Sequence, residues 1–340
     1  MKILLIKRGA MGDILMSTPL IRHLRINFPN AVIDYCLAQP FTSTLKDNPY
    51  LNKVIGVDDK VFTRKGMFAY IKFVWSIRKE YDYIFNLGKS WQLNLLNLLF
   101  CGQKIGYVRE RISKLLLNKH VVYNDIMRYH GLYYLDLLKA SCLVAIPDYN
   151  DISLDLIINA EDKLIVEAKL SELGIIEYDV VVNSGGNNQY ESGGARMLPQ
   201  DKIEQLLTCL LGAKRKVILL GGNVDRDNYS VYASIDPTNI INYAGVFNLA
   251  QSTYLISMSA HFYTTDCGAM HLGVIANMDS RMTCFFGPTA PSHVLPPNKK
   301  FNIIWEDQDI FNADYPLSGR LSKNLQGYFK RLDMKNISRR

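Results

Sequence analysis

The sequence predicts an α/β fold in which two doubly wound, Rossmann-like domains face each other across a cleft. Three observations support this prediction. The chain has 340 residues, which is more than one hydrophobic core usually serves. Apolar strands alternate with helices at the spacing that parallel sheets with helices on both faces require. This pattern stops in a polar, turn-rich stretch at Pro147–Asp155 and begins again with a strand after Asp179.

The first half opens with the apolar strand Lys2–Lys7, then a turn at Gly9–Asp13 and a helix to about Phe28. Because Pro19 lies inside this helix, we expect the helix to kink or restart there. Further strands are predicted at Ala31–Leu37 and Tyr83–Leu87, and further helices at Phe68–Lys79 and Ser90–Phe100.

A helix at Asn159–Leu173, ended by Gly174, leads into the second half. Strands are predicted there at Val180–Asn183, Lys216–Leu220, His261–Thr265 and Met282–Phe286. We therefore expect a first domain over residues 1–155, a linker helix over 156–178, a second domain over 179–318 and a final helix over 319–340.

The net charge of +7 indicates anionic partners, such as nucleic acid, phospholipid head groups or a phosphorylated substrate. No zinc finger, RNA-recognition motif or helix-turn-helix is found, so we expect no nucleic-acid partner. No apolar run approaches the roughly 18 residues that span a bilayer, and the apolar start Met1–Ile6 is too short for a signal peptide. These observations predict a cytoplasmic protein.

The six cysteines are scattered without a CxxC pair or a metal-ligand spacing, which predicts free thiols in a reducing compartment. The chain also lacks a convincing Asp-x-Asp motif. We therefore expect no bound metal and no cofactor.

The segment Tyr263–Asn277 carries the strongest functional signal. It predicts a strand that ends in a polar turn, Asp266–Gly268, which opens an apolar helix. A second strand follows and ends in Gly287 and Pro288. Such a turn presents free backbone N–H groups and the positive end of a helix at the carboxyl edge of a sheet, where α/β proteins bind phosphate.

This pattern, Asp-x-Gly-x-x-His followed by Phe-Gly-Pro-Thr, resembles the donor-site signature of glycosyltransferase family 9, the ADP-heptose:lipopolysaccharide heptosyltransferases. Five further segments resemble that family in the same order along the chain. They are Lys2–Asp13 with Thr18–Leu20, Tyr81–Gly88, Lys104–Tyr107, Leu219–Arg226 and Asn242–Gly245. The resemblance implies the GT-B architecture, an acceptor-binding first domain, a donor-binding second domain and a C-terminal helix that packs back on the first.

Asp13 is the candidate catalytic base. It follows Gly12 in a strand-to-helix turn, which can present its carboxylate to the cleft. The resemblance implies that this aspartate takes the proton from the acceptor hydroxyl and that Gly12 lies beside the acceptor. A helix N-terminus also favours the ionised carboxylate that a base requires. Alternatively, Asp13 is only the N-cap of its helix.

By the same resemblance, the donor's diphosphate and sugar lie against Asp266, Cys267, Gly268, Ala269 and His271. The family has Thr or Ser where this chain has Cys267. Because a thiol is a weaker hydrogen-bond donor, we expect the backbone rather than this side chain to act. The alternatives are a capping role for Asp266 and a buried, structural role for His271.

Arg196 is the candidate phosphate-binding cation. The segment Arg196–Pro199 occupies the place of the family's basic-x-Trp-Pro sequence, with Leu198 in place of tryptophan. An arginine can grip a phosphate with two hydrogen bonds. A plain solvated arginine is the alternative.

Several basic residues of the first half form a candidate acceptor platform for an anionic glycolipid or oligosaccharide. The strongest candidates are Arg109, Arg111 and Lys114, and the same group includes Arg64, Lys65, Lys119 and Arg128. Most of these side chains are alternatively ordinary solvated charges.

Together these features predict an inverting glycosyltransferase that moves a sugar, plausibly heptose from ADP-heptose, to a lipopolysaccharide core or related bacterial surface glycan. Its donor is a nucleotide sugar, and its anionic acceptor holds it at the inner face of the inner membrane. The alternatives are an NAD-dependent oxidoreductase, against which the missing Gly-x-Gly-x-x-Gly speaks, and an inactive glycan-binding relative.

Overall fold

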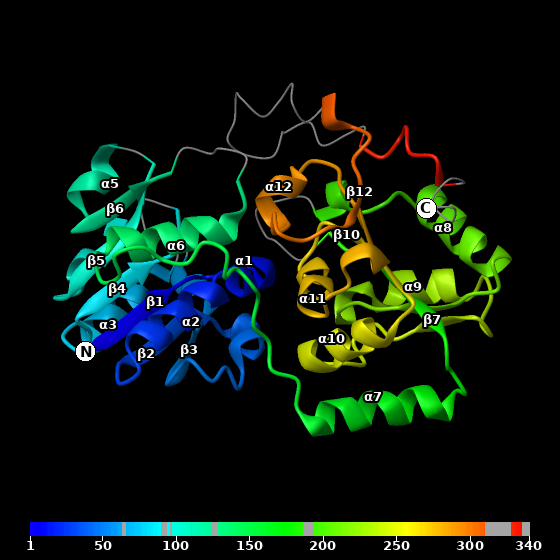
Figure 1. Cartoon of the computed structure of the whole chain (residues 1–340), viewed down its shortest axis with the longest axis horizontal. Helices are drawn as coiled ribbons and strands as arrows, with labels where there is room; N and C mark the ends of the chain where they lie inside the picture. The colour runs from blue at the N-terminus through cyan, green and yellow to red at the C-terminus, as the bar shows by residue number, and fades with distance from the viewer. Residues whose placement is uncertain are drawn as a thin grey trace. The chain divides into compact units, whose positions relative to one another are not determined.

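The computed structural model describes residues 1–62, 66–89, 94–95, 97–109, 111–123, 128–185, 193–309 and 328–334. The chain forms two compact units, Met1–Ile157 and Ile158–Arg340. Each unit holds a parallel six-stranded sheet with helices packed on it (Figure 1). The predicted α/β class with two doubly wound sheets is confirmed.

The first sheet has the strand order β3-β2-β1-β4-β5-β6, and all neighbouring strands are parallel. The strand order reverses between β1 and β4, and ligands of open α/β sheets bind at the carboxyl ends that flank such a point. The strands are β1 (Lys2–Ile6), β2 (Val32–Ala38), β3 (Lys53–Val57), β4 (Tyr83–Asn86), β5 (Gln103–Val108) and β6 (Lys119–Val122).

The helix predicted after β1 restarts at its proline, as expected. α1 ends at Met16, and α2 begins at Thr18 with Pro19 in its first turn, where a missing N–H costs no hydrogen bond. The helices of this unit are α1 (Met11–Met16), α2 (Thr18–Asn27), α3 (Met67–Ile77), α5 (Arg111–Leu115) and α6 (His130–Ala140), with 3-10 turns η1 (Gln39–Leu45), η2 (Asp59–Phe62) and η4 (Asn97–Leu99).

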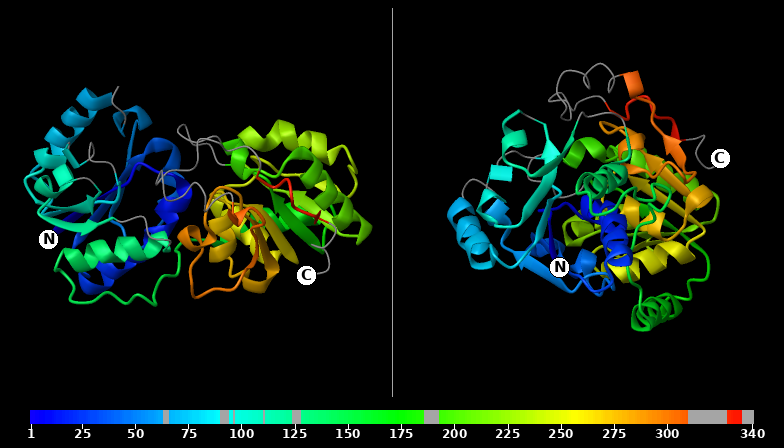
Figure 2. Two further views of the ribbon diagram at one scale, coloured as in Figure 1. Left: turned by 90° about the horizontal axis from the view of Figure 1, so that it is seen from above. Right: turned by 60° about the vertical axis from the view of Figure 1, so that its left-hand side comes forward.

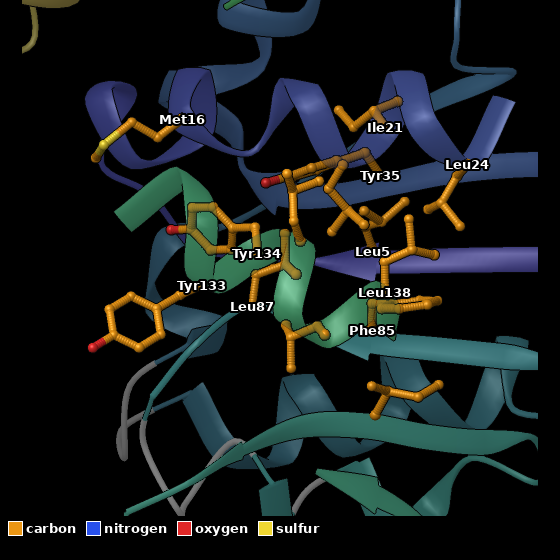
Figure 3. Close-up of a cluster of buried hydrophobic side chains, with 14 of the residues drawn as sticks. Leu5, Met16, Ile21, Leu24, Tyr35, Phe85, Leu87, Tyr133, Tyr134 and Leu138 are labelled. Atoms are coloured by element: carbon orange, nitrogen blue, oxygen red, sulfur yellow. The ribbon is translucent and has the colours of Figure 1, made fainter. Parts of the chain in front are cut away.

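The side chains of β1 alternate between two hydrophobic layers, because successive residues of a strand point to opposite faces. Ile3 and Leu5 pack in the layer that holds α2 and α6, and Leu4 and Ile6 pack in the layer that holds α3. Helices therefore cover both faces of the sheet (Figure 2). Figure 3 shows the first layer, where Tyr134 of α6 lies over the end of β1.

The second sheet has the strand order β12-β11-β10-β7-β8-β9, so its order reverses between β10 and β7. Its strands are β7 (Tyr178–Val182), β8 (Lys216–Leu219), β9 (Ile240–Asn242), β10 (His261–Thr265), β11 (Met282–Phe285) and β12 (Asn302–Ile304). Its helices are α7 (Ala160–Glu172), α8 (Gln200–Gly212), α9 (Arg226–Ala233), α10 (Leu249–Met258), α11 (Met270–Ile275) and α12 (Pro291–Val294), with 3-10 turns η5 (Gly193–Arg196), η6 (Asn223–Asp225) and η7 (Asp279–Arg281).

The helix predicted before the second half is α7, and the residues at its two ends explain why it starts and stops there. Asn159 caps its start by accepting a hydrogen bond from the Asp162 backbone at 2.8 Å. Gly174 follows its end at φ 58°, a conformation that glycine adopts without strain.

Gly273 allows α11 to lie directly on the second sheet. A Cβ atom at this position would lie 2.4 Å from Met282 Sδ and 2.7 Å from the Phe262 ring. This close approach fixes the start of α11 next to the carboxyl end of β10.

Two predicted helices fall partly outside the described residues. The helix at Ser90–Phe100 is described only at residues 94–95 and 97–100, and the C-terminal helix at 319–340 only at 328–334. The latter part is a turn whose Tyr328, Phe329, Leu332 and Met334 pack in the core of the second unit, and the packing of the C-terminal helix on the first unit stays a prediction. Among the helices that the structure describes, none combines the length and apolar composition needed to cross a bilayer.

Candidate active site

Asp13 lies at the carboxyl edge of the first sheet. β1 ends at Ile6, and α1 begins at Met11, so Asp13 occupies the first turn of the helix that follows a central strand. Gly12 is buried in the same turn. Ala10 holds the N-cap position, so Asp13 is not the cap of this helix.

Three side chains surround the Asp13 carboxylate. Lys7 Nζ lies 3.1 Å from Oδ2, the Tyr134 hydroxyl donates to Oδ1 at 3.3 Å, and His130 Nδ1 lies 3.9 Å from Oδ1. The Lys7 side chain is only 8% exposed, but that of Asp13 is 32% exposed. Lys7 is therefore shielded from solvent, whereas the Asp13 carboxylate is accessible to a ligand.

The charges around Asp13 keep its carboxyl group ionised. Burial raises the pKa of Asp13, but the positive charges of Lys7, His130 and Lys89 and the hydrogen bond from Lys7 outweigh burial. They hold the pKa of Asp13 well below its usual value of 3.8. Asp13 is consequently charged at neutral pH, as a general base must be.

We expect Lys7→Met to raise the pKa of Asp13, because the variant removes the nearest positive charge while burial, which favours the neutral acid, stays. The measurement is a ¹³C NMR titration of the Asp13 carboxyl group in wild type and variant. Since the wild-type pKa is lowered, its titration lies on the acid side of 3.8, and that of the variant should lie at higher pH. Lys53→Met, at an exposed lysine of β3, is the control, and equal midpoints in all three proteins would contradict this account.

An aromatic and basic group adjoins Asp13 along the same edge. Lys89 follows β4, donates a hydrogen bond to the Tyr123 hydroxyl at 2.6 Å and lies 4.0 Å from the centre of the Tyr123 ring. That ring contacts Tyr107 and Tyr133 at centroid distances of 5.8 and 4.9 Å. The edge therefore offers rigid aromatic surface next to the carboxylate.

The candidate acceptor residues follow β5. Arg109 comes directly after this strand, Arg111 and Lys114 lie in α5, and all three are exposed. Because the strands are parallel, the carboxyl end of β5 lies at the same edge as Asp13. A ligand that contacts Asp13 could therefore extend along this edge towards Arg109.

The other members of the predicted platform lie in different places, and of these Arg128 adjoins the aromatic group, with its guanidinium 5.2 Å from the centre of the Tyr133 ring. Lys119 begins β6, which places it at the opposite edge of the sheet from Asp13. Arg128 is engaged by Asp136, whose Oδ2 lies 2.5 Å from Nη1. Arg64 and Lys65 lie outside the described residues.

A second candidate site lies in the second unit, at the carboxyl end of β10. β10 ends at Thr265, the turn of residues 266–269 follows, and α11 begins at Met270. Met270, His271 and Leu272 donate backbone hydrogen bonds to Cys267, Gly268 and Ala269. The Ala269 N–H contacts the Cys267 thiol, and the N–H groups of Cys267 and Gly268 precede the helical hydrogen bonds. His271 is buried in the first turn of α11.

The structure brings Arg196 and Asp266 together, although 70 positions separate them in the sequence. Arg196 Nε lies 3.6 Å from Asp266 Oδ2. That oxygen is buried and accepts no hydrogen bond from any residue that the structure describes. Because buried carboxylate oxygens almost always accept hydrogen bonds, this oxygen is suited to a donor from a ligand, such as a sugar hydroxyl.

Asn183 fixes the segment that carries Arg196. Its Oδ1 accepts from the Leu198 N–H at 2.8 Å, and its Nδ2 donates to the Leu198 carbonyl at 3.1 Å. Thr265 Oγ1 also bonds to both backbone groups of Ser184, at 2.7 and 3.2 Å. The loops after β7 and β10 are thereby joined, which holds Arg196 next to Asp266.

Cys267 is buried, and its Sγ lies 3.8 Å from Thr264 Oγ1. Burial raises the pKa of its thiol, which favours the neutral form.

Within the described part of the chain, no group of three or more His, Cys, Asp or Glu side chains is placed to hold a metal ion. An open hollow of about 580 Å³ lies at the amino edge of the first sheet, lined by residues such as Met1, Lys79 and Gly102. It is at the opposite edge from Asp13 and is not part of the candidate site.

Sequence reasoning missed the partners of Asp13 and Arg196. Lys7 directly follows the apolar run Ile3–Ile6 and precedes the Gly9–Asp13 turn, so its place in the sequence was an available signal. His130, Tyr134 and Lys89 reach Asp13 through tertiary structure and carry no local signal. Asn183 was assigned to a strand rather than to the site.

The model of glycosyltransferase family 9 (heptosyltransferase) matches residues 71–312 of the sequence. The chain belongs to this family. Lipopolysaccharide heptosyltransferase 3 of Escherichia coli (strain K12) is 38% identical over 90 residues, a stretch that spans only 25% of this chain and 25% of that protein. Lipooligosaccharide heptosyltransferase 2 of Haemophilus ducreyi is 24% identical over 315 residues, or 89% of this chain and 88% of that protein.

The solved structure of E. coli ADP-heptose lps heptosyltransferase II has the same fold. It matches with a TM-score of 0.69 at 21% identity, covering 89% of this chain and 90% of that one. The predicted family is confirmed, and these relatives give no support to the oxidoreductase or to the inactive glycan-binding alternative.

Proposed function

We propose that this member of family 9 is an inverting glycosyltransferase that moves a heptosyl group from ADP-heptose to a hydroxyl of a lipopolysaccharide core. The names of its relatives supply the donor and acceptor classes: one is an ADP-heptose lps heptosyltransferase and another a lipopolysaccharide heptosyltransferase. The nucleotide sugar is a substrate, and the proposal requires no cofactor.

The observation that carries the proposal is the environment of Asp13. Its carboxylate is held ionised by Lys7, oriented by Tyr134, and open to a ligand at the carboxyl edge of the sheet. A structural ion pair would gain nothing from this partial exposure. A base that must contact a substrate hydroxyl requires it.

In the proposed reaction, the acceptor oxygen attacks the anomeric carbon of the donor sugar. The bond from that carbon to the diphosphate oxygen breaks, ADP leaves with the bonding electrons, and the configuration at the carbon inverts. Asp13 takes the proton of the acceptor hydroxyl. Its low pKa makes it a weak base towards a free alcohol, so the proton moves late, when the attacking oxygen has already become positive and strongly acidic.

The second candidate site, at the carboxyl end of β10, is proposed to hold the donor. Arg196 contacts the diphosphate, where its positive charge stabilises the negative charge that develops on the leaving ADP. The buried oxygen of Asp266 accepts a hydrogen bond from a sugar hydroxyl. The backbone N–H groups of Cys267, Gly268 and Ala269 and the side chain of His271 complete the contacts.

The acceptor is proposed to be an anionic glycolipid. Arg109, Arg111 and Lys114 provide exposed positive charge near the carboxyl edge that carries Asp13, and the net charge of the chain is +7. The enzyme would then work in the cytoplasm, at the inner face of the inner membrane, where these charges favour anionic surfaces.

A thermal-shift screen against ADP-heptose, UDP-, GDP- and CMP-sugars and NAD tests the donor. A ligand at 100 times its dissociation constant stabilises by about 2.7 kcal/mol, which should raise Tm by roughly 5–10 °C. We expect that shift with ADP-heptose in wild type and a smaller one in Asp266→Asn. A shift with another nucleotide sugar instead would replace heptose as the donor, and a shift with NAD alone would overturn the proposed function.

A further inference from the structure

We propose that the outward face of α3 is a membrane-docking surface that rests on an anionic lipid bilayer. Most of α3 is apolar, with the sequence MFAYIKFVWSI. Its Tyr70 and Val74 are fully buried in the layer against the first sheet. Two of its largest side chains nevertheless point away from the protein, with Phe68 82% and Trp75 56% exposed.

These exposed residues form one line along the helix. Phe68, Lys72 and Trp75 follow one another at intervals of four and three positions, the spacing at which helical residues share a face, and Lys79 follows two residues after the end of α3. Lys72 and Lys79 are exposed, and the Arg78 guanidinium lies 3.4 Å from the centre of the Trp75 ring. Alternating aromatic and basic residues are typical of helices that lie in a membrane interface, where rings enter the acyl boundary and lysines reach the head groups.

The 3-10 turn η4 packs next to α3. The Tyr70 hydroxyl donates a hydrogen bond of 2.7 Å to Asn97 Oδ1, which ties the turn to α3. Its neighbour Leu98 is 44% exposed. This buried contact holds α3 in place against the sheet while Phe68 and Trp75 remain exposed.

The basic residues of this surface favour binding to a lipid bilayer over binding to a second copy of the chain. In a symmetric dimer through α3, Lys72, Arg78 and Lys79 would face their own copies, and Glu80 could offset only part of that repulsion. An anionic bilayer complements these charges, and its interface accepts tryptophan and phenylalanine side chains. The docking proposal rests on the proposed function in one respect: docking would bring the enzyme to a lipid-linked acceptor. Binding to the bilayer itself requires no acceptor.

The test is co-sedimentation with vesicles of phosphatidylcholine mixed with phosphatidylglycerol and with vesicles of phosphatidylcholine alone. We expect wild type to bind the anionic vesicles at low salt and far less to the neutral ones. Phe68→Gln/Trp75→Gln should lower the partition coefficient about tenfold or more. Lys72→Gln/Lys79→Gln should lower it about 25-fold, since each lysine contributes about fivefold.

Leu164→Gln/Ile176→Gln is the matched control, because it removes two exposed aliphatic side chains from the second unit. It should bind like wild type. Trp75→Phe keeps an apolar ring and should still bind, but should lose part of the blue shift in fluorescence that wild type shows on anionic vesicles.

Undiminished binding of Phe68→Gln/Trp75→Gln would overturn the proposal, as would dependence on Arg109, Arg111 and Lys114 alone. A dimer in analytical ultracentrifugation that Phe68→Gln/Trp75→Gln abolishes would also overturn it and make α3 a protein interface. Activity on a delipidated oligosaccharide acceptor should stay unchanged in the α3 variants. Failure of the docking proposal thus leaves the proposed function standing, and loss of the thermal shift with ADP-heptose tests that function separately.

Discussion

Replacing Asp13 by Asn is expected to lower the rate of sugar transfer about 10²–10⁴-fold, the usual effect of losing a positioned base. The amide keeps the shape of the side chain and can still accept a hydrogen bond from Lys7, but it cannot take a proton. Donor affinity should change little, because the proposed donor contacts belong to the second unit. Steady-state kinetics with saturating donor and acceptor provide the rate.

The Tm of Asp13→Asn must be measured as a control, because this variant leaves the buried Lys7 ammonium without its charge partner. The double variant Lys7→Met/Asp13→Asn removes both charges and should recover any lost Tm while staying inactive. Glu161→Gln, at an exposed acid in the first turn of α7, should keep wild-type activity. A folded Asp13→Asn enzyme that turns over at nearly the wild-type rate would show that the base lies elsewhere.

Arg196→Ala is expected to weaken the binding of ADP and ADP-heptose about 10- to 150-fold. A charge-assisted contact to phosphate contributes roughly 1.5–3 kcal/mol, which corresponds to that range. Isothermal titration calorimetry provides the dissociation constants. Arg196→Lys should recover only part of the affinity, because lysine keeps the positive charge but cannot form bidentate hydrogen bonds to a phosphate.

Arg331→Ala is the matched control, since Arg331 is also an arginine of the second unit paired with an aspartate, Asp309, but is 58% exposed. It should bind ADP as wild type does. His271→Ala should weaken binding in the same direction as Arg196→Ala. An unchanged dissociation constant in both Arg196→Ala and His271→Ala would remove the donor-site assignment.

Most of the central strands of the two sheets could be predicted because they are largely buried and rich in apolar, aromatic and β-branched residues. β10 begins and ends where the sequence predicts, and β1, β2, β4, β7, β8 and β11 differ by one or two residues. The edge strands β3, β6, β9 and β12 escaped prediction, because they are short and half-exposed and therefore mix polar with apolar residues. Their pairing comes from the neighbouring strand rather than from local sequence.

The candidate site was predictable only where a local motif marked it. The turns that hold Asp13 and Asp266 carry glycine and aspartate at fixed spacing after a strand, and they lie where that pattern indicates. The approach of Arg196 to Asp266 depends on Asn183 and Thr265, which fold two distant loops together. Likewise, His130 and Tyr134 reach Asp13 only because α6 packs over the end of β1.

Analysis of the acceptor product tests the central claim most directly. A lipopolysaccharide core that lacks its heptose is incubated with ADP-heptose and either wild type or Asp13→Asn, and the product is analysed for mass by mass spectrometry and for anomeric configuration by NMR. The account predicts that wild type adds one heptosyl group with inversion at the anomeric carbon and that the variant adds none in the same time. Retention of configuration, or equal transfer by the two proteins, would contradict it.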